Sequence, residues 1–208
     1  MALIRFAFEA DCDNEDTSRF IRTFVGSIYE LIDNEASDDD LKEVPVGTVN
    51  VILIQRDRIV DAEESLFEAM EENSHETCEC FESIFDFESN DWNAEIESLY
   101  EPEMLGPFNL LLIEKIEVNH DWRGKGIGSS VIREVVSIFR SSCGLICCKP
   151  FPLQYSGWQE REETTKQKNE REEAFHRIKE FWKSLGFRDV PGSEFVVFSP
   201  EFDVMPID

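Results

Sequence analysis

The chain is short of positive charge. Its 208 residues include 20 Lys and Arg against 45 Asp and Glu, a formal net charge of -25 at pH 7. A field of this sign repels nucleic acid and anionic membranes and concentrates cations. The sequence also lacks an apolar run of membrane-spanning length, and no basic segment at the N-terminus leads into a long apolar core. These absences predict a cytoplasmic protein that binds neither nucleic acid nor membrane.

The sequence lacks the cysteine framework of a small secreted domain as well. Six cysteines occupy positions 12, 78, 80, 143, 147 and 148 without even spacing, so we expect reduced thiols. His75, Cys78 and Cys80 form an H-x-x-C-x-C pattern that could start a metal site, but no matching second pair follows. Cys147 and Cys148 fall in an apolar run, where inert core thiols are the usual case. We therefore expect no metal ion.

Apolar residues are plentiful: 41% of the chain is hydrophobic and 17 residues are Phe, which is enough for a buried core. With no internal repeat or low-complexity linker, we expect one domain over residues 1–208. The acidic residues are unevenly distributed along the chain. Residues 1–108 contain 29 Asp and Glu against 6 Lys and Arg, whereas residues 109–208 contain 16 against 14. Two interpretations of the acidic half stay open. It favours a cationic partner, or it is a solvated surface that serves solubility or a high-salt habitat.

Hydrophobic periodicity in the acidic half predicts strands and helices in alternation. Residues 3–9 and 46–55 are typical of strands, with a loop over residues 34–43. Phe20, Phe24, Ile28 and Leu31 recur at helical spacing after N-cap candidates, so we expect an amphipathic helix there. A helix over residues 61–73 and short helices over 74–103 would form an acidic helical insertion at about residues 61–104.

The pattern becomes sharper in the second half. Residues 108–118, with LLLIEKIEV at their centre, predict a long strand, and residues 127–140 predict a helix. The same apolar patterns predict a short buried strand over residues 145–148 and a last strand over residues 195–198. Between them the loop KPFPLQYSGW leads into a charged helix that ends in FWKSLGF, where Gly186 is typical of a helix C-terminus.

The long strand and its helix are joined by VNHDWRGKGIGSS, residues 118–130. Unpaired backbone N–H groups converge at the positive end of a helix, and glycine lets a phosphate approach them closely, so this is a candidate anion site. A P-loop would need Ser or Thr where Gly126 stands, and a dinucleotide fingerprint would need its third glycine where Ser129 stands. A glycine-rich turn without a ligand is the alternative.

These residues resemble the GCN5-related N-acetyltransferases, the GNAT superfamily. The family signature, Arg/Gln-x-x-Gly-x-Gly/Ala after a long strand ending in Val, is met by Arg123, Gly126 and Gly128, five residues past Val118. FWKSLGF resembles a second landmark, and the similarity covers about residues 109–199. The resemblance implies an α/β, GNAT-like acyl-CoA fold with a mixed, mostly antiparallel central sheet flanked by helices. Residues 1–107 would form the acidic acceptor-side half, and residues 108–199 the acetyl-CoA-binding half.

The resemblance implies that acetyl-CoA binds as cosubstrate in a wedge between two strands. The main chain of Ile116 and Val118 would pair with the pantetheine arm, and Trp182 would line the cofactor site. An acceptor amine would attack the thioester directly. Backbone N–H groups would bind the pyrophosphate, and they come from Arg123, Gly124, Lys125, Gly126, Ile127, Gly128 and Ser129.

Two glutamates on the long strand are candidate bases for the amine proton. Strand alternation predicts that Glu114 shares a face with Leu112, Ile116 and Val118, and that Glu117 shares the opposite face with Lys115. Glu114 is the first candidate and Glu117 the second. An ordinary surface glutamate is the alternative at Glu114.

The chain departs from the family at two positions. Trp182 stands where the family often has Tyr as an acid toward the departing thiolate, and Phe175 stands where Asn is common. The thiolate then leaves unprotonated, Tyr155 supplies the proton, or catalysis is lost. We expect an N-acetyltransferase acting on a cationic primary amine, with a homodimer allowed. The alternatives are an inactive CoA-binding module and an acidic protein that binds a basic partner.

Overall fold

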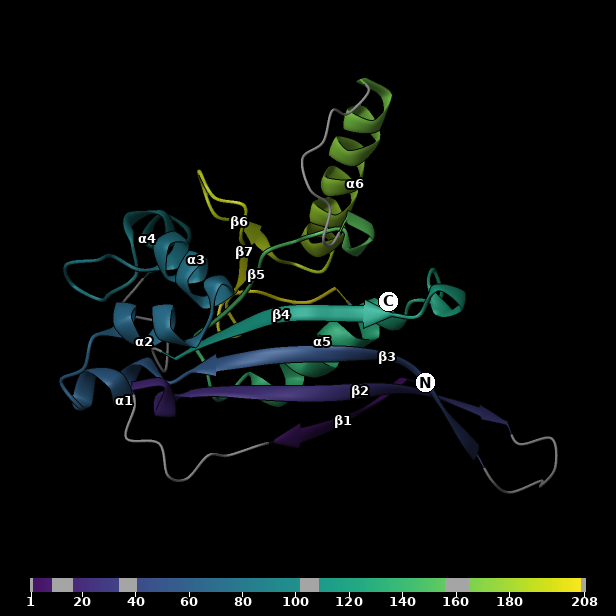
Figure 1. Ribbon diagram of the computed structural model, residues 1–208, viewed down its shortest axis with the longest axis horizontal. Coiled ribbons are helices and arrows are strands. Elements are labelled where there is room, and N and C mark those ends of the chain that lie inside the picture. Colours follow the sequence, from purple (N-terminus) through teal and green to yellow (C-terminus); the bar gives the residue numbers. More distant parts are fainter. Residues whose placement is uncertain (1, 9–16, 34–40, 102–108, 156–164, 207–208) are drawn as a thin grey trace.

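The structure is a computed structural model that describes residues 2–8, 17–33, 41–101, 109–155 and 165–206. Within these ranges seven strands form one open sheet in the order β1-β2-β3-β4-β5-β7-β6 (Figure 1). Among them β4 and β5 are parallel, and the other neighbours are antiparallel. The strands are β1 (Ala2–Phe8), β2 (Ile21–Asp33), β3 (Leu41–Ile54), β4 (Leu110–Val118), β5 (Leu145–Cys148), β6 (Arg188–Asp189) and β7 (Val196–Phe198).

Helices cover both faces of the sheet, so the chain has the mixed α/β architecture that the sequence predicts. Four short helices between β3 and β4 gather at one end of the sheet (Figure 1): α1 (Arg56–Asp61), α2 (Leu66–Asn73), α3 (His75–Ile84) and α4 (Ala94–Leu99). They form one apolar core with one face of the sheet. The other core lies between the opposite face, α5 (Ile127–Phe139) and the C-terminal part of α6 (Thr165–Ser184). Three 3-10 turns complete the described elements: η1 (Thr17–Phe20), η3 (His120–Trp122) and η4 (Leu153–Tyr155).

The helix predicted around Phe20, Phe24, Ile28 and Leu31 is wrong, because residues 21–33 are strand β2. A spacing of four residues fits a strand as well as a helix, since every fourth residue of a strand returns to the same face. Phe24 and Ile28 pack into the core shared with α5. Residues Ile21 to Asp33 pair with β3, and the backbone hydrogen bonds of this pairing favour the strand over a helix.

The other predicted elements are largely confirmed. The long strand and the helix after the glycines are β4 and α5, and the short buried strand is β5. Gly186 follows the C-terminus of α6, which ends at Ser184, and has a φ of 96°. The helix predicted over residues 61–73 is interrupted, because α1 ends at Asp61 and Ser65 caps a new helix, α2. Residues 41–43 of the predicted loop belong to β3, and residues 34–40 lie outside the described ranges.

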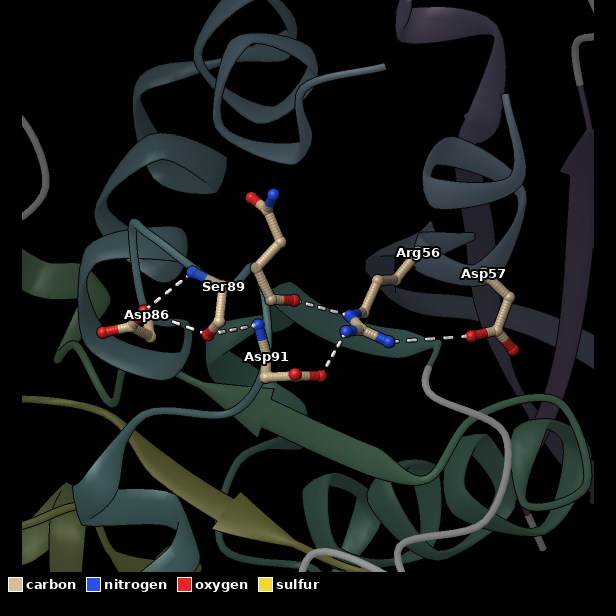
Figure 2. A network of polar contacts seen from close by, with 6 residues as sticks. Arg56, Asp57, Asp86, Ser89 and Asp91 are labelled. Carbon is tan, nitrogen blue, oxygen red and sulfur yellow. Dashed lines mark hydrogen bonds and ion pairs between the residues drawn. The ribbon is translucent and has the colours of Figure 1, made fainter. Parts of the chain in front are cut away.

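A buried arginine fastens the helical insertion to the end of β3. Arg56 is 8% exposed; its Nε donates to the carbonyl oxygen of Asn90 at 2.7 Å, and its guanidinium pairs with Asp91 and Asp57 (Figure 2). In the same turn the Asp86 carboxylate accepts from the backbone N–H and the hydroxyl of Ser89, and the backbone bond contributes most to lowering the pKa of Asp86. The turn between α3 and α4 is therefore held against the start of α1.

No helix in the described part of the chain combines the length and the apolar character needed to cross a bilayer.

Candidate functional site

A wedge opens where β4 and β5 part. The two strands pair from Leu110 with Leu145 to Leu112 with Cys147, and β5 ends at Cys148. On its other side β4 remains paired with β3 as far as Val118. The edge of β4 beyond Leu112 is therefore open toward the gap, and such an edge presents unpaired backbone groups to a ligand.

A pocket of about 390 Å³ fills this wedge. Its walls come from the open edge of β4, the start of α5, the residues just after β5 and one side of α6. They are largely apolar, as ligand pockets usually are. Residues from three of these elements include Ile116, Val118, Gly128, Ile132, Phe181 and Trp182.

Strand β4 contains a bulge at Glu114. Lys115 pairs with Asn50 and Ile113 pairs with Val51, so Glu114 has no opposite residue in β3. One extra residue reverses the side-chain alternation beyond it.

The bulge overturns one part of the predicted side-chain faces of β4, the placement of Leu112. Leu112 packs into the core of the helical insertion, whereas Ile116 and Val118 pack on the α5 side together with Ile113. The prediction that Leu112 shares a face with Ile116 and Val118 is therefore wrong. The open half of β4 instead presents its apolar residues to the wedge pocket.

The structure separates the two candidate bases. Glu114 is exposed and lines the pocket. Glu117 is not among the lining residues; its carboxylate lies 2.6 Å from the Lys115 ammonium, whose hydrogen bond lowers the pKa of Glu117. Of the two, Glu114 is the one positioned to meet a substrate in the wedge.

The glycine loop adopts a conformation that most residues avoid. Gly124 and Gly126 have φ of 73° and 78°, and a Cβ added to either would meet no atom within 4 Å, so the space beside the loop is open. Gly126 is the N-cap of α5 and offers no side-chain acceptor, and the first turn contains no acidic residue. The N–H groups of Ile127, Gly128 and Ser129 therefore have no partner within the helix and suit an anion.

Basic residues flank this loop and connect it to the pocket. Arg123 lines the pocket, and its Nε donates to the carbonyl oxygen of Val118 at 2.9 Å, which ties the loop to the end of β4. The Lys125 ammonium lies 4.3 Å from the centre of the Trp122 ring. Of the predicted loop residues, Arg123 and Gly128 line the pocket, while the Ile127 side chain is buried in the core.

The aromatic position at the end of α6 is part of the pocket wall. Trp182 is buried and meets Phe187 edge to face, with ring centres 4.9 Å apart. Phe175 contacts Phe151, which also lines the pocket. Tyr155, at the end of η4, is half-buried and is not among the lining residues.

The charge of the pocket is opposite to that of the chain. The charged residues in the described part of its lining are one acid, Glu114, and four bases: Lys115, Arg123, Lys149 and Arg177. A second cavity of about 420 Å³ is lined by four acids: Glu79, Glu82, Glu95 and Glu194. Within the described ranges Lys149 is the one residue that lines both cavities, so it stands between a basic and an acidic compartment.

Lys149 is held firmly at this boundary. Its Nζ lies 3.0 Å from Glu79 and 3.1 Å from Glu194. Partial burial acts to lower the pKa of Lys149, but the hydrogen bonds to the two carboxylates outweigh it and raise the pKa overall. The ammonium therefore stays charged at neutral pH. Our sequence reasoning did not single out Lys149; its place directly after the buried strand LICC was the available signal.

The H-x-x-C-x-C residues do not converge. His75 is exposed and pairs with Glu79, whereas the Cys80 thiol is buried 3.3 Å from that of Cys147. Among the described residues no group of three His, Cys, Asp or Glu is arranged to bind a metal ion. Cys147 and Cys148 are buried, and burial raises the pKa of both thiols, as expected for core cysteines.

No protein-family model matches the chain, and no curated protein matches it. The functional assignment therefore depends on the geometry and chemistry of the wedge pocket.

Proposed function

We propose that the protein is a GNAT-type N-acetyltransferase that moves an acetyl group from acetyl-CoA to a primary amine, with preference for a cationic acceptor. The observation that carries the proposal is the wedge between β4 and β5, which leads to a glycine loop at the N-terminus of α5. A long, flexible thioester with an anionic end needs both parts: an open strand edge for its amide-containing arm and backbone donors for its phosphates.

The donor would lie along the open half of β4. The pyrophosphate would accept hydrogen bonds from the N–H groups of the loop, with Arg123 and Lys125 adding positive charge. The arm would pass Ile116 and Val118, against the apolar wall that α6 supplies through Phe181 and Trp182. The thioester would then reach the closed end of the wedge, beside Glu114.

The reaction would join the acceptor nitrogen to the acetyl carbon and break the bond from that carbon to sulfur. The CoA thiolate leaves with the electron pair of the broken bond, and the nitrogen loses one proton. Glu114 would accept this proton, directly or through water, because it is the carboxylate that lines the pocket. Holding amine and thioester together in the wedge supplies the proximity that the uncatalysed reaction lacks.

The charges favour a cationic acceptor. Residues 1–108 contain 29 acidic against 6 basic residues, and the cavity beyond Lys149 is lined by four glutamates. Such a field concentrates cations near the reaction site. Polyamines, aminoglycoside-like amines and basic peptides have the required chemistry.

Two measurements test the proposal. Acetyl-CoA should raise the thermal midpoint, because a ligand that binds the folded state stabilises it, and free CoA thiol should appear when a panel of amines is added. Binding of acetyl-CoA without thiol release with any amine would favour an inactive CoA-binding module. That alternative is considered because Trp182 stands where the family often has a Tyr acid. Absence of both signals would favour an acidic protein that binds a basic partner.

A further inference from the structure

The closed end of the wedge has a charged residue on each side. Leu112 and Cys147 are the last paired residues of β4 and β5, and Glu114 and Lys149 each lie two residues beyond them. Both residues line the pocket. An acidic residue of β4 and a basic residue just after β5 therefore border the same space.

We propose that Lys149 stabilises the departing thiolate, donating a hydrogen bond from its ammonium to the sulfur as the bond to the acetyl carbon breaks. This inference rests on the proposed function. It assigns to Lys149 a positive charge toward the thiolate that neither Trp182 nor Tyr155 supplies, because an indole is uncharged and Tyr155 does not line the pocket.

The surroundings of Lys149 suit this role. Two carboxylates, Glu79 and Glu194, hold the ammonium from the side of the second cavity. The three N–H donors of this ammonium have three carboxylate oxygens within reach, two of Glu79 and one of Glu194, so a thiolate would take the place of one of these oxygens. Because the remaining carboxylate contacts keep the ammonium in place, the exchange of one acceptor is the reorganisation needed when negative charge develops on sulfur.

The raised pKa of Lys149 indicates that it acts on the thiolate as a positive charge and not as a proton donor. A group that retains its proton is a poor acid but a permanent positive charge. Lys149 therefore stabilises the thiolate as an ion-paired anion, and the thiolate takes its proton from water after release. The acetylated nitrogen has meanwhile given up its proton to Glu114 or water, so the charges balance.

The experiment compares two acetyl donors in the wild type and in Lys149→Met, Lys149→Gln and Lys149→Arg. One donor is acetyl-CoA, and the other is the acetyl thioester of an aromatic thiol, whose thiolate needs less stabilisation. We expect Met and Gln to lower kcat with acetyl-CoA on the order of 100-fold, the usual effect of losing one aimed donor. We expect a clearly smaller loss with the aromatic thioester, and partial recovery in Lys149→Arg.

Lys179→Met is the matched control. Lys179 has nearly the same side-chain exposure as Lys149, 34% against 33%, and is ion-paired with Asp189 at 3.2 Å, but it does not line the pocket. The Lys179→Met variant should retain the wild-type kcat with both acetyl donors. Thermal midpoints, with and without acetyl-CoA, report folding and donor binding in every variant, and the Gln variant serves if the Met variant does not fold.

The outcomes separate this inference from the proposed function. If the wild type releases thiol but the Met and Gln variants lose equal activity with both donors, or none, Lys149 has no role at the leaving group and the inference is wrong. If the wild type binds acetyl-CoA and releases no thiol with any amine from either donor, the proposed function fails and the inference fails with it.

Discussion

At the residue scale, Glu114 combines an unpaired position in β4 with access to the wedge pocket. We predict that Glu114→Gln lowers turnover by roughly 100-fold, within the range of general-base contributions. It should leave the shift of the thermal midpoint by acetyl-CoA unchanged. The deficit should narrow as pH rises, because the acceptor amine then deprotonates without help.

Glu117→Gln is the control for this prediction. Glu117 lies outside the pocket and pairs with Lys115, so its removal should change turnover little. Equal activity of Glu114→Gln and the wild type across the pH range would rule out Glu114 as the base.

Gly126 is the second residue on which the proposal depends. We predict that Gly126→Glu abolishes the shift of the thermal midpoint by acetyl-CoA, because a carboxylate would stand where the phosphates bind. A non-glycine residue at φ 78° costs about 1–2 kcal/mol, so the unliganded variant should be moderately less stable but folded.

Gly192→Glu separates strain from binding. Gly192 has φ 74° and equally open surroundings, and it lies between β6 and β7 rather than at the N-terminus of α5. It should lose comparable stability and still respond to acetyl-CoA. A full response in Gly126→Glu would remove the glycine loop as the phosphate site.

At the scale of elements, the open edge of β4 depends on its close pairing with β3. A Cβ at Gly47 would lie 2.1 Å from the carbonyl oxygen of Glu117, so the two strands approach there as only glycine allows. Because the obstructing atom belongs to the backbone, the clash cannot be relieved by a side-chain rotation.

We predict that Gly47→Ala lowers the free energy of unfolding by about 1–3 kcal/mol, as overpacking usually does. Denaturant titration measures the change. Thr48→Ala, at an exposed position of the same strand, is the control and should alter stability by less than about 1 kcal/mol. Equal stability of Gly47→Ala and Thr48→Ala would show that the strands can separate here at little cost.

At the scale of the whole molecule, the uneven charge distribution affects the two substrates differently. The acceptor is attracted by the field of the acidic half, which salt screens over roughly 8–10 Å, whereas backbone donors at the glycine loop bind acetyl-CoA. We predict that added salt raises the KM for a cationic amine more than the KM for acetyl-CoA. Steady-state kinetics with matched cationic and neutral amines at two salt concentrations measures this. Equal use of the neutral amine and no effect of salt would mean that the acid serves solubility.

The part of the site that depends on local sequence was predicted from the sequence. The strand β4, the glycine loop and α5 are contiguous, and their pattern depends on neighbouring residues: apolar periodicity for the helix and positive φ for Gly124 and Gly126. Glu114 was a candidate for the same reason, since it lies on that strand. These features need no knowledge of distant parts of the chain.

What depends on distant partners was decided by the tertiary structure. Residues 21–33 form a strand because β3 pairs with them, although their apolar spacing suits a helix equally well. The bulge at Glu114 exists only in register with Asn50 and Val51, and it reverses the faces of Ile116 and Val118. Lys149 borders the wedge because β5 lies beside β4 and ends at Cys148, directly before it. Register and strand order arise from pairing between segments far apart in the chain, so no local pattern contains them.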